Sequence, residues 1–140
     1  MKFPWHSDKE EGADGNAGGS YASEAVVESR AVPGVTLTIA KMSFGRRVEL
    51  MRRVRELARR AEFLAASEHS GDQMDGAVQR AEIERLYVMW GVKAVSGLVV
   101  DARVAGPELL AEAGPEELFR EALAAVRRET GLSEEERKNS

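Results

Sequence analysis

Residues 42–64, MSFGRRVELMRRVRELARRAEFL, carry the apolar spacing that most constrains the fold. Apolar side chains recur there at steps of four and three residues, which places them on one stripe of an α-helix that packs against another helix. Ser43 precedes the stripe and is well placed as the N-cap of this helix. Further apolar residues widen the stripe toward the breadth of a globular core. The central set is Leu50, Val54, Leu57, Ala61 and Leu64, and the widening set is Val48, Met51, Ala58 and Ala65.

The same helix carries seven arginines between Arg46 and Arg60. Four of them fall on the face opposite the apolar stripe, together with Glu49 and Glu56. Each glutamate has arginines three and four residues further along, a spacing that supports a helix through local ion pairs. The sequence therefore predicts a solvated face on which much of the positive charge is neutralised locally. The four arginines are Arg52, Arg53, Arg59 and Arg60.

Three arginines, Arg46, Arg47 and Arg55, lie outside this arrangement and are the candidate partner-binding residues. Arg46 and Arg47 stand near the helix N-terminus, where the helix dipole disfavours cations, so a partner or an acidic neighbour would explain them. Residues 43–68 hold seven basic and four acidic residues, a net charge of +3. A surface that follows a nucleic-acid backbone usually needs about six or more phosphate contacts, so a solvated face or a site for an acidic protein segment is favoured over a nucleic-acid site. The nucleic-acid alternative would use Arg46, Arg47, Arg52, Arg55 and Arg59.

A second helix is predicted from Asp72, which can cap it, to about Trp90. With the first helix it forms an antiparallel helical hairpin. Gly91 follows where a C′ glycine ends a helix. Tyr87 and Trp90 are suited to lining a pocket, but at helical spacing we interpret them as core residues. The apolar side of this helix comprises Val78, Ala81, Ile83, Leu86, Tyr87 and Trp90.

Two segments have the character of β-strands. Residues 35–39 follow the turn signal Pro33-Gly34 and alternate between apolar and small or polar side chains. Residues 95–104 are rich in valine around Asp101-Ala102, which predicts a short hairpin with a bulge or bend at Gly97. The economical arrangement is one small antiparallel sheet built from both segments.

Two C-terminal helices are predicted to start at Gly106-Pro107 and Gly114-Pro115, with the proline as the first residue of each helix. Gly131 closes the second of them. The sequence thus predicts an α+β fold that is mainly α-helical, with a helical hairpin, C-terminal helices and a small antiparallel β-sheet. The buried stripe of the last helix is Leu118, Phe119, Ala122, Leu123 and Val126.

Composition divides the chain into three parts. Residues 1–31 hold six acidic and three basic residues and a Gly/Ser-rich run without apolar periodicity, so they are predicted to be a disordered acidic arm. Residues 32–132 are predicted to form a single helical domain with a small sheet. Residues 133–140 are predicted to be a mobile C-terminal tail.

No catalytic, cofactor or metal site is predicted. The chain has no cysteine, and its two histidines, His6 and His69, lack the spacing of metal ligands. Nucleophile-elbow and phosphate-loop motifs are missing as well. We therefore predict a non-enzymatic protein. Membrane association is not expected, because no apolar run approaches the roughly 20 residues of a membrane span, and without a secretory signal the cytoplasm of the host cell is the expected location.

A family resemblance adds a role. The segments TIAKMSFGRRVELMRRVRELARRAEFL, AEIERLYVMWGV and GLVVDARVAGPELLAEAGPEELFREALAAVRRETGLSEEERKNS are similar to tail assembly chaperones encoded in the tail-morphogenesis region of long-tailed phages and prophages. The resemblance covers about residues 32–140. It implies a protein that coats the tape-measure protein before the tail tube polymerises and is then released. It carries over no functional residues.

Two other roles stay open at this point. A structural head–tail connector or minor tail protein would remain in the virion, unlike a chaperone. A nucleic-acid-binding regulator would act through the arginine-rich helix and lose affinity steeply with salt. Association of the chain into a homo-oligomer is also left open.

Overall fold

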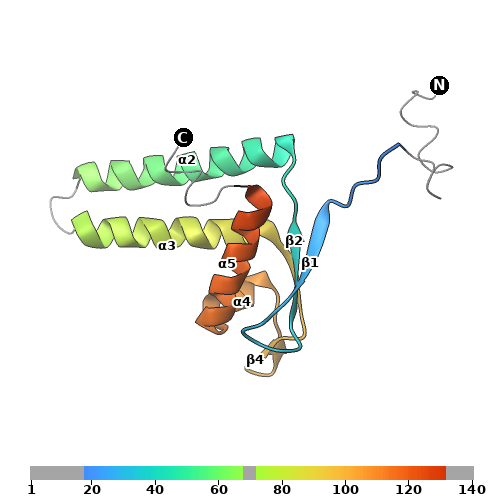
Figure 1. The fold of residues 1–140 in the computed structure, drawn as a ribbon. Coiled ribbons are helices and arrows are strands. Elements are labelled where there is room, and N and C mark those ends of the chain that lie inside the picture. Colours follow the sequence, from blue (N-terminus) through green and yellow to red (C-terminus); the bar gives the residue numbers. More distant parts are fainter. Residues whose placement is uncertain (1–17, 68–71, 132–140) are drawn as a thin grey trace.

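The computed structural model describes residues 18–67 and 72–131, with side chains for residues 18–63 and 76–131. The fold is α+β and mainly helical, as the sequence predicts: a long helical hairpin, two C-terminal helices that pack against its second helix and a small antiparallel sheet at one end (Figure 1). In chain order the described elements are β1 (Glu24–Glu28), β2 (Thr36–Ala40), α2 (Phe44–Ser67), α3 (Asp72–Gly91), β3 (Val92–Ser96), β4 (Val99–Val100), β5 (Arg103–Val104), α4 (Pro107–Ala113) and α5 (Glu116–Thr130).

The helical hairpin of α2 and α3 is confirmed. Ser43 caps α2, since its hydroxyl accepts a hydrogen bond from the Arg46 N–H at 3.3 Å. Leu50 is buried on the side of α2 that faces α3, but the predicted widening of the stripe is wrong for two residues. Val48 is 38% exposed and Met51 is 62% exposed. The physical reason is that α2 packs against α3 on one flank, so the adjoining flank keeps its apolar side chains in contact with solvent.

Helix α3 is the central helix of the fold. It contacts α2 on one side, α4 and α5 on the other, and continues into β3. Tyr87 and Trp90 are buried, which confirms them as core residues. Gly91 is not the left-handed C′ residue that was predicted, because it lies within α3 and has no positive φ. It is needed for packing instead, since a Cβ there would lie 2.6 Å from Cγ1 of Val126 on α5.

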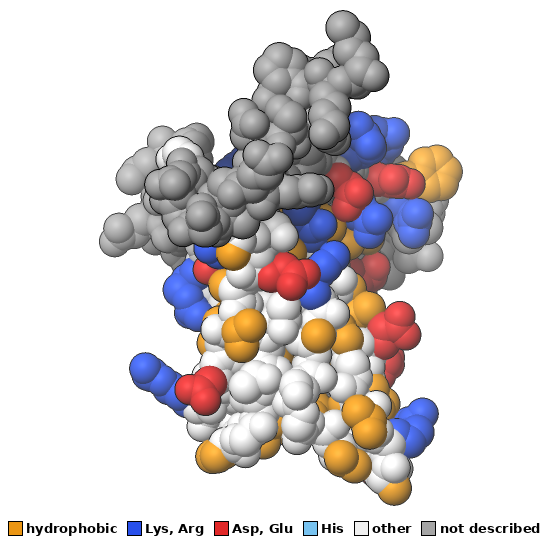
Figure 2. Space-filling view, turned by 90° about the vertical axis from the view of Figure 1, so that its right-hand side faces the viewer, with side chains coloured by type: hydrophobic (Ala, Val, Ile, Leu, Met, Phe, Trp, Pro, Cys, Tyr) orange, Lys and Arg blue, Asp and Glu red, His pale blue; other side chains and the backbone are white. Residues whose placement is uncertain are grey.

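The larger sheet has the strand order β1-β2-β3, and both neighbouring pairs are antiparallel. Strand β2 confirms the strand predicted at residues 35–39. Its Leu37 and Ile39 are fully buried, and α5 packs against this strand. The alternate residues Thr36 and Thr38 are only half-buried and lie on the other face. Figure 2 looks onto this open face, where uncharged side chains and backbone predominate and charged groups gather above them.

Strands β4 and β5 confirm the predicted hairpin. Asp101 and Ala102 both have positive φ, 49° and 64°, the backbone pattern of a type I′ two-residue turn. The prediction of one sheet from both segments is right in part, because Val95 and Ser96 in β3 pair with Leu37 and Thr36 of β2. Among the described residues, β4 and β5 form a separate two-stranded sheet with each other. Gly97, at φ 89°, turns the chain out of the first sheet between β3 and β4.

Part of the predicted disordered arm is a strand, which corrects the boundary drawn at residue 31. Strand β1 pairs with β2 along all five of its residues, and Val27 packs against the core. Just before β1, the Ser23 carbonyl accepts a hydrogen bond from the Lys41 N–H at 2.9 Å. Hydrogen bonds to β2 hold β1 in an extended conformation, and the composition of residues 1–31 does not reveal this pairing. The rest of the predicted arm, residues 1–17, and the predicted tail, residues 133–140, lie outside the described residues.

The C-terminal helices begin close to where the prolines predict. Pro107 is at the start of α4, whereas Pro115 is the N-cap of α5 rather than its first residue. Gly131 closes α5 in the left-handed conformation, at φ 76°. The predicted stripe of α5 is buried except at Phe119, which is half-buried.

Glu121 on α5 holds the turn that follows β1. Its carboxylate accepts hydrogen bonds from the Ser29 hydroxyl at 2.5 Å and the Arg30 N–H at 2.7 Å. Burial raises the pKa of Glu121, but the hydrogen bonds from Ser29, Arg30 and Ala31 and the charge of Arg30 outweigh it and lower the pKa from its ordinary 4.5. A lowered folded-state pKa stabilises the fold fully at higher pH, and this contribution is lost as pH falls through that pKa.

We expect Glu121→Gln to lower the free energy of unfolding by about 1 kcal/mol at neutral pH, because charge-assisted hydrogen bonds are replaced by weaker ones at a partly solvated site. The difference between native and variant should shrink as pH falls below about 4.5, where the native carboxylate itself becomes protonated. Urea unfolding at several pH values measures it. The control is Glu117→Gln, one turn earlier on α5 and exposed. An equal loss in both variants, or a loss independent of pH, would contradict the expectation.

Candidate protein-binding groove on helix α2

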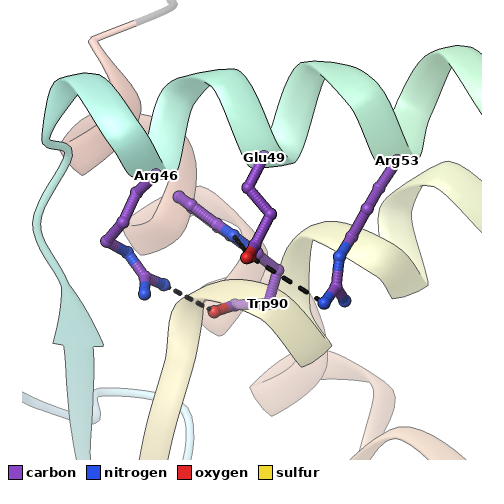
Figure 3. Close-up of polar contacts among 4 residues, drawn as sticks. All are labelled: Arg46, Glu49, Arg53 and Trp90. Carbon is purple, nitrogen blue, oxygen red and sulfur yellow. Dashed lines mark hydrogen bonds and ion pairs between the residues drawn. The ribbon is translucent and has the colours of Figure 1, made fainter.

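One flank of α2 is fastened to α3 by polar contacts around Trp90 (Figure 3). Arg46 Nη2 donates a hydrogen bond to the Trp90 carbonyl oxygen at 3.0 Å, and the Arg46 guanidinium carbon lies 4.4 Å from the centroid of the Trp90 ring. The indole N–H of Trp90 donates to Glu49 Oε1 at 3.1 Å. Arg53 Nη2 lies 3.8 Å from the same carboxylate oxygen. These contacts set how α2 lies across the end of α3.

Arg46 therefore has an intramolecular partner in Trp90, which corrects the expectation that no neighbour engages it. Its guanidinium is directed onto the Trp90 ring and carbonyl, as Figure 3 shows. Residues 46, 49 and 53 are spaced by three and four, so they share one flank of the helix. That spacing is the sequence signal for the cluster, although it does not identify Trp90 as what the flank meets.

The adjoining flank of α2 borders a groove with a volume of about 770 Å³. Exposed Met51 and Val48 form the upper part of its apolar lining, and the buried Leu50 and Tyr87 lie deeper. Tyr87 belongs to α3, so the groove follows the hairpin on the side away from Arg53. Among the described residues the groove is lined by Met42, Arg47, Val48, Leu50, Met51, Arg52, Val54, Arg55, Glu56, Arg59 and Tyr87.

Positive charge dominates the rim of this groove. Four arginines line it, namely Arg47, Arg52, Arg55 and Arg59, against Glu56 as the one carboxylate among its described lining residues. A further arginine approaches from α5, where the guanidinium carbon of Arg127 lies 5.8 Å from the centroid of the Tyr87 ring. The site thus combines an apolar floor with a cationic rim.

The structure brings together two of the three predicted site residues, Arg47 and Arg55, and separates Arg46 from them. It also adds Arg52 and Arg59, which were predicted to be neutralised on the far face. Within the described part of the chain, the ion pair of α2 is Arg53–Glu49, and neither Arg52 nor Arg59 takes part in one. The Glu49 carboxylate contacts Trp90 and Arg53, and Glu49 is not among the residues that line the groove.

A second hollow of about 460 Å³ lies on the opposite flank of the hairpin. Its charged groups are mixed, since Arg53, Arg60 and Arg85 stand beside Glu56 and Glu82. It therefore lacks the single sign of charge that marks the groove along Met51. Arg60, which is exposed here, provides a matched control for charge changes in the groove.

The described residues contain no cluster of three or more histidine, aspartate or glutamate side chains suited to a metal ion. Across the same ranges, no helix combines the length and apolar character required to cross a membrane. Comparison of the chain with protein-family models, with curated proteins and with solved structures gives no match in any of the three.

Proposed function

We propose that this chain is a non-enzymatic protein-binding protein that acts as a tail assembly chaperone of a long-tailed phage or prophage and holds the tape-measure protein before the tail tube forms. The observation that carries the binding role is the exposed apolar surface of α2 beside the arginine-rimmed groove. Phe44 is 83% and Phe63 is 74% exposed on this helix, in addition to Met51. Large exposed apolar surfaces of this kind mark protein contacts. The sequence resemblance supports the identity of the partner.

A chaperone of long amphipathic helices needs an adaptable apolar surface and no chemistry of its own. Met42 and Met51 both line the groove, and unbranched methionine side chains adjust to partners of different shape. The arginine rim keeps this surface hydrated until a partner covers it. These features support a shielding role better than proton transfer or covalent catalysis.

Co-purification from cells that express the tail genes tests the proposal. The tagged full-length chain should retain the tape-measure protein, and mass spectrometry of purified virions should find no copies of the chain. Failure to retain the tape-measure protein would contradict the chaperone role. Detection of the chain in virions would favour the alternative of a structural connector or minor tail protein.

The nucleic-acid alternative has a separate test. Phosphate contacts by Arg47, Arg52, Arg55 and Arg59 would leave the apolar floor of the groove exposed to solvent. The apolar floor therefore argues against a nucleic-acid partner. A duplex DNA probe at low salt should therefore show no shift with the full-length chain. A shift that weakens steeply as salt increases would support the regulator instead.

A further inference from the structure

We infer that the α2 groove receives one amphipathic helix of a protein partner, with apolar side chains on one face and carboxylates along its flank. The inference rests on the proposed protein-binding function and specifies the chemistry of the partner segment. It depends on three properties of the groove, which are its length, the kind of surface on its floor and the sign of its charge.

The length of the groove suits a short helix. Its lining on α2 runs from Arg47 to Arg59, which is about 18 Å at roughly 1.5 Å per residue, or about three helical turns. A partner helix of the same length can present apolar residues at positions i, i+3 or i+4, and i+7. That spacing supplies about three anchors, enough to cover the row formed by Val48, Met51 and Val54.

The floor of the groove favours a helix over a strand. Its described lining residues come from α2, from α3 and from Met42 just before α2, where backbone N–H and C=O groups are used within the helices. A strand would find no extended edge there to complete its own hydrogen bonds. A helix satisfies its backbone internally and packs its ridges between those of α2. Burial of the exposed parts of Met51 and Val48 would drive this contact.

The rim of the groove selects the sign of the partner's charge. Arg55 and Arg59 are four residues apart, and Arg52 and Arg55 are three apart, so their guanidinium groups follow the helix axis at one-turn intervals. Carboxylates spaced by one turn on a partner helix would meet them in the same register. A lysine-bearing helix would meet repulsion at each turn. Arg127 beside Tyr87 adds positive charge from the α5 side.

Peptide binding tests the inference on the full-length chain. One probe is a synthetic peptide of about 18 residues, roughly five turns, with leucines on one face and glutamates on the flanks. The matched probe has a lysine at each glutamate position. Fluorescence anisotropy should show binding of the acidic peptide, at least about tenfold weaker binding of the lysine peptide, and loss of affinity with salt. Equal affinity for both peptides would overturn the inference.

Three variants locate the binding site. Met51→Asp and Arg55→Glu should each weaken binding of the acidic peptide by about tenfold or more. Arg60→Glu makes the same charge change on the opposite flank and should alter affinity by less than about twofold. All three positions are exposed, so the unfolding midpoints should stay close to native. Native affinity in both groove variants, or an equal loss in Arg60→Glu, would place the peptide elsewhere and overturn the inference.

Two other occupants are distinguished by the same measurements. A second copy of the chain is the occupant if the native chain does not bind the peptide and forms a concentration-dependent dimer in sedimentation that Met51→Asp abolishes. A segment of the chain itself is the occupant if the native protein does not bind the peptide but a full-length variant does. The two variants to test carry glutamines at positions 134–136 or alanines at positions 3 and 5. Either result overturns the inference.

The outcomes separate this inference from the proposed function. If the peptide binds at the groove but the chain does not retain the tape-measure protein, the inference about the groove is supported and the proposed chaperone role is contradicted. Equal retention of the tape-measure protein by native chain and Met51→Asp would support the phage role and overturn the groove as its docking site.

Discussion

Replacement of Gly97 by alanine should lower the free energy of unfolding by about 3 kcal/mol. Gly97 has a φ of 89°, a conformation that residues with a side chain rarely adopt. An added Cβ would also lie 2.4 Å from the carbonyl oxygen of Gly34. Since that oxygen belongs to the backbone of the turn before β2, the clash can be relieved only by moving the chain. The turn between β3 and β4 would therefore separate from the turn before β2.

Gly34→Ala is the matched control for this prediction. Gly34 has nearly the same φ, 93°, but an added Cβ would meet nothing within 4 Å. Its substitution therefore measures the backbone strain without the clash, and we expect a loss of about 1 kcal/mol. Urea unfolding of both variants gives the comparison. Equal losses would show that the contact between Gly97 and Gly34 adds nothing to the stability of the fold.

Gly97 also shows what a sequence can and cannot reveal about this fold. A glycine inside a valine-rich segment indicates a bulge or bend, and the bend is there. The contact that forbids any larger residue comes from Gly34, 63 residues earlier in the chain. Gly91 makes the same point more strongly. Its position at the end of a helical pattern indicated a C′ cap, whereas the real constraint is Val126 of α5.

Periodicity predicted the helices and β2 well because each repeats a pattern over several turns or residues. Strand β1 was missed because its residues EAVVE do not alternate strictly between apolar and polar side chains and follow a glycine-rich run. Its stability comes from pairing with β2, which no local pattern records. The number of buried apolar residues on α2 was also overestimated, again because burial depends on a neighbour distant in the sequence. A helical pattern shows which residues share a face, but not whether a neighbour covers all of it, so Met51 was predicted to be buried and is exposed.

The candidate site was half predicted. Local spacing suggested that Glu49 would neutralise Arg52 and Arg53, leaving Arg46 unpaired. In the structure Glu49 accepts a hydrogen bond from Trp90, 41 residues away, and the Trp90 carbonyl takes Arg46. The predicted local pair with Arg53 does form, and the same carboxylate oxygen also serves as the acceptor that the buried indole N–H needs. Arg47 and Arg55 make no side-chain hydrogen bond or ion pair with another described residue, and they lie on the rim of the groove.

Trp90→Ala should lower the free energy of unfolding by about 3–4 kcal/mol, because it removes a large buried ring and the surface on which Arg46 rests. Trp90→Phe keeps most of the buried area and loses the N–H donor to Glu49, so its loss should be about 1–2 kcal/mol. Urea unfolding followed by circular dichroism measures both, since the signal does not depend on the indole.

Hydrogen exchange then separates a local role of Trp90 from a general one. Helix α2 packs against α3, and the contacts of Arg46 and Glu49 with Trp90 lie at the end of the hairpin nearest the sheet. Their loss should open α2 before it opens β2, whose Leu37 and Ile39 are buried under α5. We therefore expect amides of α2 to lose protection in Trp90→Ala by a larger factor than amides of β2. An equal loss in both elements would mean that Trp90 stabilises the core as a whole and does not specifically position the helix that carries the groove.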